Sequence, residues 1–193
     1  EEYVAVSRYI ACELGIDYYD ECSFLPNQMM YMPTTPSDGE YVFKELDGAV
    51  LNPDDILKAH PEWRDVSTLP MSKKEKEIKP KADKKQQNPK DKEGVVGAFC
   101  RAYGGITNVI DRFLPDVYRA SEVAGRYDYI GGESTAGLVI YDDTFAYSHH
   151  ATDPASHKLM NAFDIVRIHK FPDSDEKESF KKMSAFAVSL DEV

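Results

Sequence analysis

The feature that most constrains this chain is a lysine-rich stretch at 71–93 that is almost free of apolar residues. After Met71 its apolar residues are Ile78 and Ala82, and it holds nine lysines and five acids. Such a segment buries too little surface to offset the entropy lost on ordering its full length. The sequence therefore predicts three parts, namely a unit at 1–70, a charged linker with some helix in its middle at 71–93, and a second unit at 94–193.

Size, charge and cysteine content narrow the class of protein. The 193 residues, 42% of them hydrophobic, suffice for one ordinary core or two small ones. The net charge of −11 argues against a general nucleic-acid coat. The sequence shows no membrane-spanning apolar run and no secretory leader, and the cysteines at 12, 22 and 100 fit neither a disulfide framework nor a metal knuckle. We expect a cytoplasmic protein with reduced thiols and no membrane partner.

The first unit begins with a pattern typical of an amphipathic helix. Its apolar residues recur at spacings of three and four, and Gly15 follows as a C-terminal cap. The residues that define the apolar face are Tyr3, Val6, Ile10 and Leu14. A helix on a partial antiparallel sheet is the expected architecture, with an exposed sheet edge or loose packing.

Two strands and a second helix are expected in the rest of this unit. Apolar and aromatic residues predict strands at 28–32 and 41–43. Asn52 followed by Pro53 supplies an N-cap and a first-turn proline for a short helix at 54–60.

The second unit combines helical patterns with a clear hairpin signal. Strands at 138–141 and 145–147 flank the polar turn 142–144. A further strand is expected at 127–130. The predicted helices are 95–103, then 108–114 with Thr107 as its cap, 162–169, and a last helix capped by Ser174 whose face is Phe180, Met183, Ala187 and Leu190. The whole chain is thus predicted to be α+β, with a small helical, hairpin-containing second module.

Three stretches of the sequence resemble a known family. Residues 15–33, with the sequence GIDYYDECSFLPNQMMYMP, look like the third catalytic motif of the archaeo-eukaryotic primase superfamily. Their form resembles prophage proteins in which a primase-polymerase precedes a helicase of the virulence-associated protein E type. Residues 95–103 and 125–171 look like the region between primase and helicase in those proteins. The resemblance implies an internal piece of a phage DNA primase-polymerase, from the C-terminal part of its primase domain onward.

The resemblance also implies a catalytic carboxylate. Asp20 matches the motif's acid, which binds the Mg²⁺ or Mn²⁺ ions that act on a nucleoside triphosphate. Asn27 and Gln28 match positions that meet the nucleotide, although Gln28 stands where relatives tend to have arginine and carries no charge. The family's two other acids and its histidine motif are not recognisable, so this chain alone is expected to be inactive. Asp17 and Glu21 are the alternative ligands under the resemblance. Without it, Asp20 is a turn residue and Asp17 a strand-edge residue.

A binding module without chemistry is the alternative hypothesis. The second unit would then position a DNA template, or couple the primase to a helicase in the same polypeptide or in the replisome. The basic candidates for nucleic-acid contacts are Arg126, Arg167, His169 and Lys170, and each could equally be a solvated charge. The lysine run is either a salt-sensitive tether to phosphates or, given its interspersed acids, a solvated linker.

The remaining motifs point to structure more than to chemistry. His149, His150, Asp153 and His157 could suggest zinc, but adjacent residues of an extended segment face opposite sides, which favours a hydrogen-bonded loop. The glycine-rich stretch 131–137 lacks the Lys-Ser/Thr ending of a phosphate-binding loop, and no serine has the setting of a hydrolase nucleophile.

Overall fold

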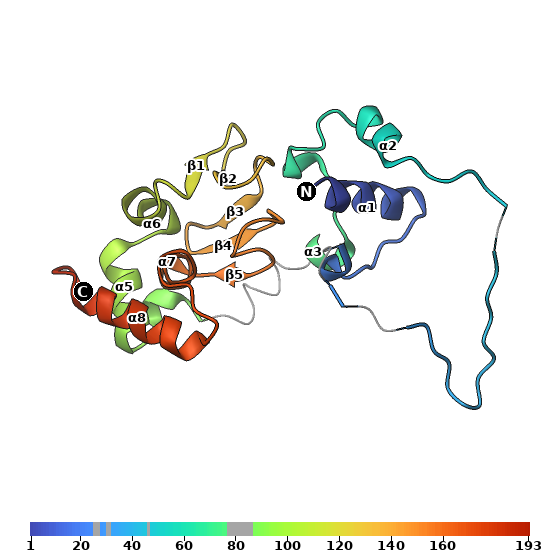
Figure 1. Ribbon diagram of the computed structural model, residues 1–193. Helices are drawn as coiled ribbons and strands as arrows, with labels where there is room; N and C mark the ends of the chain where they lie inside the picture. The colour runs from blue at the N-terminus through green and yellow to red at the C-terminus, as the bar shows by residue number, and fades with distance from the viewer. Residues whose placement is uncertain (25–27, 30–31, 46, 77–86) are drawn as a thin grey trace.

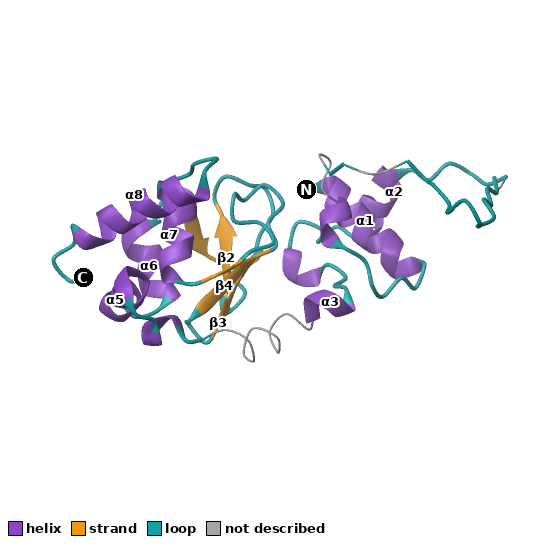
Figure 2. Ribbon diagram, turned by 90° about the horizontal axis from the view of Figure 1, so that it is seen from below, coloured by secondary structure: helices purple, strands orange, loops and turns teal. Residues whose placement is uncertain are grey.

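A computed structural model of the protein describes residues 1–24, 28–29, 32–45, 47–76 and 87–193. The architecture is α+β, as predicted. A five-stranded antiparallel sheet lies between the helices of the second unit and those of the first (Figures 1 and 2). Among the described residues, no helix is long and apolar enough to cross a membrane.

Both helices predicted in the first unit are present. Helix α1 spans Glu2–Glu13, and Gly15 follows it in the left-handed region, at φ +67°, where glycine carries no steric penalty. Helix α2 spans Pro53–Ala59, and the side chain of Asn52 accepts a hydrogen bond from the backbone N–H of Asp54 at 3.1 Å. The predicted N-cap and first-turn proline of α2 are therefore confirmed.

The buried face of α1 differs from the predicted one. Tyr3 and Leu14 are 50% and 69% exposed, so the outer ends of the predicted apolar stripe face solvent. Tyr9 instead packs in a small core and stacks on the ring of His60 at 3.7 Å. The core residues of this unit are Ala5, Tyr9, Trp63, Val66 and Leu69. The buried face of α1 differs from the predicted one because its apolar partners come from a short connection. That connection includes the 3₁₀ helix η2 at Val66–Thr68.

The strands predicted at 28–32 and 41–43 are not found among the described residues. Met30 and Tyr31 lie outside that set, and the backbone of 32–45 is irregular. A strand requires a partner for its backbone N–H and C=O groups, and the described chain offers none here. A 3₁₀ helix, η1 at Glu21–Phe24, precedes this segment. The expected loose packing is seen in its exposed apolar side chains, which are Met29, Met32, Tyr41, Val42, Phe43, Val50 and Leu51.

The start of the predicted linker forms a short helix, α3, at Lys73–Lys76. The backbone N–H of Glu75 donates to Ser72 Oγ at 3.1 Å, and the N–H of Ser72 donates to Glu75 Oε2 at 3.0 Å. This reciprocal capping box satisfies two backbone donors at once. The contacts of the first unit thus extend beyond residue 70, its predicted end. The 3₁₀ helix η3 at Pro89–Asp91 packs on the second unit, and residues 77–86 lie outside the described set.

The sheet is an antiparallel meander in the order β1-β2-β3-β4-β5. Its strands are β1 Tyr118–Ala120, β2 Arg126–Tyr129, β3 Leu138–Tyr141, β4 Phe145–Ser148 and β5 Leu159–Met160. The predicted hairpin is confirmed, because β3 pairs with β4 and Tyr141 lies opposite Phe145. The edge strands β1 and β5 were not predicted, because segments this short leave no alternating pattern in the sequence.

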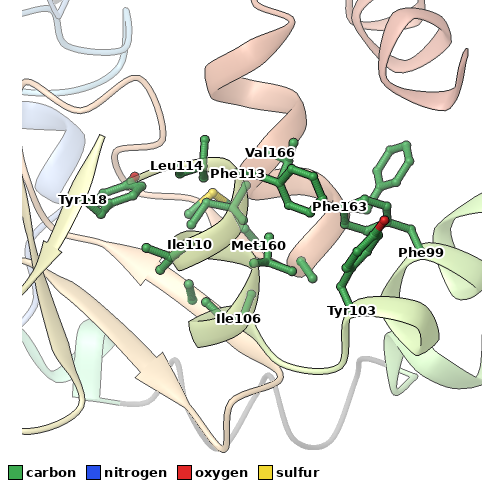
Figure 3. Packing of buried hydrophobic residues seen from close by; sticks show 14 of the residues in the cluster. Phe99, Tyr103, Ile106, Ile110, Phe113, Leu114, Tyr118, Met160, Phe163 and Val166 are labelled. Atoms are coloured by element: carbon green, nitrogen blue, oxygen red, sulfur yellow. The ribbon is translucent and has the colours of Figure 1, made fainter. Parts of the chain in front are cut away.

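Helices of the second unit pack on one side of the sheet, as Figure 2 shows. They are α5 Gly94–Tyr103, α6 Ile106–Phe113, α7 Ala162–Lys170 and α8 Glu176–Val188, which confirms the four predicted helices. Phe99 is fully buried and meets Phe163 edge-on at 5.9 Å, and Tyr103 meets Phe113 edge-on at 4.9 Å (Figure 3). Edge-to-face pairs of this kind add to the stabilisation from buried area.

The caps of these helices differ from the predicted ones. Helix α8 is capped by Asp175, not Ser174, and α6 starts one residue before Thr107. The cap of α6 comes from the hairpin turn, because Asp143 Oδ1 accepts from the N–H of Thr107 at 2.9 Å and also from its hydroxyl. A Cβ at Gly105 would lie 1.6 Å from the Asp143 carboxylate, so this close approach requires glycine. The hairpin and the helix are therefore locked together.

We predict that Asp143→Ala lowers the free energy of unfolding by about 1 kcal/mol more than Asp142→Ala. Both aspartates have φ +49°, so the two substitutions share the backbone cost, and Asp143 alone caps α6. Urea unfolding of the two variants measures the difference. Equal losses would show that the carboxylate does not cap the helix.

Candidate functional site

The acid predicted to bind metal lies on the surface opposite the lysines of α3. Asp20 is 60% exposed, and its Oδ1 lies 3.3 Å from Nζ of Lys74. Asp17 forms the neighbouring ion pair with Lys73, whose Nζ also lies 5.6 Å from the ring centre of Tyr18. The two acids thus face two ammonium groups. The Lys73 ammonium lowers the pKa of Asp17 below its ordinary value.

Backbone contacts hold the acidic segment against the segment that leads into α3. The N–H of Lys73 donates to the carbonyl oxygen of Asp17 at 2.9 Å, and the hydroxyl of Tyr19 donates to the carbonyl oxygen of Pro70 at 3.2 Å. Arg8 donates to the same Pro70 oxygen at 2.9 Å. The position of the lysines relative to the acids is therefore set by main-chain geometry as well as by charge.

A buried ion network anchors α3 to both units, and we call Arg8, Glu75 and His149 the joint. Arg8 makes a bidentate pair with Glu75, with N–O distances of 2.8 and 2.6 Å. Nδ1 of His149, which follows β4, lies 3.2 Å from Glu75 Oε1. All three side chains are at least 97% buried. The joint connects α1, α3 and the second unit through one carboxylate.

The charge of Glu75 is stabilised by these partners. Burial alone would raise the pKa of Glu75, but hydrogen bonds from Arg8 and His149 outweigh it and hold the pKa well below its usual range. The carboxylate is therefore ionised whenever the joint is intact at neutral pH. The joint was not predicted, although two signals pointed to it. Ser72 and Glu75 have the spacing of a capping box, which places both at the start of a helix. Arg8 follows Val4 by four residues, which places it on the same face of α1 as an apolar residue.

Main-chain bonds reinforce the contact between the units. The N–H of Val66 donates to the carbonyl oxygen of Thr135 at 3.0 Å, and the N–H of Thr135 donates to that of Arg64 at 2.7 Å. The carboxylate of Glu1 accepts from the N–H of Glu133 at 3.1 Å. The glycine-rich stretch 131–137 is thus part of the contact with the first unit.

The structure gives few contacts for the other residues predicted to bind the nucleotide and the metal. Asn27 lies outside the described residues, and so does the side chain of Glu21. Gln28 is exposed and donates to the adjacent carbonyl oxygen of Met29, at 3.3 Å. Within the described part of the chain, no three His, Cys, Asp or Glu side chains are grouped to hold a metal ion. The described residues therefore do not form a metal site by themselves.

The four basic residues predicted to contact nucleic acid are not brought together. Arg126 is half-buried and donates to the carbonyl oxygen of Ala136 at 2.8 Å. Arg167 lies 3.8 Å from Asp164, and its guanidinium also reaches the hydroxyl of Ser179. These contacts turn both guanidinium groups toward the protein.

The other two of the four lie near the end of α7. Lys170 is exposed beside the rings of Phe113 and Phe186, 5.8 Å from each ring centre. His169 is buried, and burial lowers its pKa, so it is not presented as a surface cation. The proposed contacts with nucleic acid stay a prediction.

His169 belongs to a buried polar network around Asp153. The hydroxyls of Tyr118 and Ser148 each donate to Asp153 Oδ2 at 2.6 Å, and the N–H of Ala155 donates to Oδ1 at 2.7 Å. Nε2 of His169 lies 2.8 Å from the Tyr118 hydroxyl. Burial raises the pKa of Tyr118 above its ordinary value, which keeps the phenol protonated. This network joins β1, β4 and α7 and has a structural role.

The adjacent histidines have different partners, as the alternation argument predicted. His149 belongs to the joint, whereas His150 lies 2.7 Å from the hydroxyl of Ser134 and accepts from the N–H of Tyr129 at 3.0 Å. Burial lowers the pKa of His150, which favours the neutral ring that can accept this bond. The pair is therefore part of the scaffold.

A hollow lies between the two units. Its volume is about 590 Å³, and residues 1–3, 131–133 and Thr152 line it. Glu1, Glu2 and Glu133 make it acidic, and Asp20 is not among the residues that line it. An acidic groove of this kind repels phosphates, so it does not suit a nucleotide without cations.

The comparison with protein families finds one match, and it falls on the first unit. Residues 1–72 match the model of the VapE N-terminal domain. The first unit is therefore similar to the N-terminal domain of VapE-type proteins. It covers the acidic segment with Asp20 and stops before Glu75 of the joint. No curated protein and no solved structure matches the chain.

We predict that Glu75→Gln lowers the free energy of unfolding at neutral pH by about 3 kcal/mol, because it leaves the buried Arg8 without a counter-charge. The pKa of Glu75 is depressed in the folded state, so its stabilising contribution is present above the ordinary pKa of a glutamate. It is lost as the pH falls through the depressed pKa.

The difference in the free energy of unfolding between wild type and Glu75→Gln should therefore become smaller below about pH 4.5. Urea unfolding at neutral and acid pH measures it. Glu178→Gln, which changes a half-exposed glutamate of α8, is the control. A gap that stays constant with pH, or one as small as the control's, would contradict the role of the joint.

Proposed function

We propose that this chain is part of a phage-type DNA primase-polymerase and that Asp20 supplies one of its metal-binding carboxylates. The observation that carries the proposal is the match of residues 1–72 to the VapE N-terminal domain, because it contains the segment that resembles the third catalytic motif. The exposure of Asp20 supports it, because the carboxylate already faces a cation from the solvent side.

The role of Asp20 would be to hold a divalent cation. Hard cations such as Mg²⁺ and Mn²⁺ are bound by carboxylate oxygens, and a bound pair of them would supply the charge that a phosphoryl transfer requires. One carboxylate does not form such a site, so further acids must converge on Asp20 in the active enzyme. Gln28 lies near the acidic segment in sequence and would donate an uncharged hydrogen bond to a nucleotide phosphate.

A non-catalytic coupling module is the second candidate. The observation that favours it is the joint, which ties the second unit to the segment that carries Asp20. The second unit has a large core of its own, with Phe99, Ile106 and Phe163 fully buried. Such a rigid body can transmit the position of a neighbouring helicase to the first unit without contributing catalytic groups.

We predict that Asp20→Asn abolishes primer synthesis in the longest polypeptide that the gene encodes, because an amide cannot replace the charged ligand. Template-dependent synthesis with Mg²⁺ or Mn²⁺ and nucleoside triphosphates is the measurement. Asp38→Asn, in an exposed turn, is the matched control and should retain synthesis. Circular dichroism checks that both variants fold. Synthesis by Asp20→Asn at the control's rate would reject the assignment.

Titration of the chain with single-stranded DNA at two salt concentrations tests whether a non-catalytic module would act through nucleic acid or through a protein. If the lysine segment and Lys170 bind phosphates, affinity should fall steeply as salt rises, because cations are released from the DNA on binding. Lys170→Gln should weaken binding, whereas Lys58→Gln, an exposed lysine of α2, should not. Absence of salt-dependent binding would exclude nucleic-acid contacts and leave coupling to a protein.

A further inference from the structure

The cation-facing positions of Asp17 and Asp20 are taken by lysines of the chain itself. We propose that α3 is an autoinhibitory element, whose Lys73 and Lys74 cover the two acids while the joint is closed. This inference rests on the proposed function, because it concerns the carboxylate assigned there to metal binding. The acids and lysines come from segments more than 50 residues apart in sequence, so the contact is made by the tertiary fold.

The geometry of α3 presents its lysines and its glutamate to different surroundings. Glu75 is buried in the joint, whereas the side chains of Lys73 and Lys74 are 52% and 54% exposed. Figure 1 shows α3 close to the 3₁₀ turn that follows α1, where the acidic segment lies. Because α3 is a single short turn, the anchoring of Glu75 also determines where the two ammonium groups stand.

The joint makes this placement depend on the second unit. His149 follows β4, and Nδ1 of its ring lies 3.2 Å from Oε1 of Glu75. If the second unit moves away, Glu75 loses that contact, and the anchor of α3 is weakened while Arg8 remains. The lysines then lose part of their fixed position over the acids. A partner that shifts the second unit would therefore expose the acidic segment.

The strength of the cover suits a reversible block. Exposed lysine–carboxylate pairs change an equilibrium by only about twofold to fivefold each, because water screens them. A metal ion that meets several carboxylates can displace two such lysines, whereas one that meets Asp17 and Asp20 alone competes with them. The two lysines therefore weaken metal binding most when Asp17 and Asp20 are the only carboxylates that the ion meets.

Titration of the full chain with Mn²⁺ at low ionic strength, followed by the electron paramagnetic resonance signal of the free ion, tests the proposal. The variant K73Q/K74Q should bind Mn²⁺ about fivefold more tightly than wild type, because both ammonium groups are removed. The matched control is K58Q/K181Q, which removes two exposed lysines that also pair with carboxylates. Adding D17N/D20N to K73Q/K74Q should remove the gain.

The link to the second unit is tested by His149→Gln, which keeps both lysines. It should reproduce part of the gain in Mn²⁺ affinity, and circular dichroism checks its fold. A gain for K73Q/K74Q no larger than that of K58Q/K181Q, or no Mn²⁺ binding by any variant, would overturn the cover. A gain for K73Q/K74Q without any for His149→Gln would overturn the control by the second unit.

These outcomes are separate from those that bear on the proposed function, because no synthesis is measured. If Asp20→Asn retains primer synthesis while K73Q/K74Q binds Mn²⁺ more tightly, the catalytic assignment fails and the cover stands. If Asp20→Asn abolishes synthesis while K73Q/K74Q shows no gain, the catalytic assignment stands and the cover fails.

Discussion

The carboxylate of Glu75 is buried, so its negative charge needs partners inside the protein. The arrangement of α1, α3 and the second unit depends on how these partners are supplied. Its charge is matched by Arg8 of α1, and it also contacts the ring of His149 in the second unit, so its partners come from different parts of the chain. A buried pair of this kind is weak evidence for net stability, because desolvation offsets much of the attraction. It is stronger as a constraint on geometry, since any other arrangement leaves a charge buried without a partner. We therefore regard the joint as the contact that sets the orientation of the two units.

The joint also connects the scaffold to the acidic segment. Glu75 lies next to Lys73 and Lys74, so the residues that pair with Asp17 and Asp20 are positioned by the same short helix. The match to the VapE N-terminal domain ends at residue 72, before this helix begins. The contact between lysines and acids thus joins the matched region to residues that follow it.

The second unit has its polar groups largely satisfied internally. Asp153 accepts from two hydroxyls and a backbone N–H, and His150 is held by Ser134 and backbone groups. Such a network is stable only when its members are paired, and it then holds strands and helices in one arrangement. His150 and His169 are therefore part of the scaffold of this unit.

The sequence by itself determined the α+β class, the helices with strong periodicity or caps, and the central hairpin. These features depend on neighbouring residues, as with Asn52 before Pro53 or the turn at 142–144. The short strands β1 and β5 were beyond it, because only pairing with β2 and β4 defines them. The irregular backbone at 41–43 was mispredicted for the converse reason, since residues with strand propensity find no partner in the described chain. The tertiary structure alone decided that Arg8 points inward, that His169 is buried, and that Lys74 meets Asp20. Each of these depends on polar or charged residues that are far apart in the sequence and close in space. A local sequence pattern carries no information about such contacts.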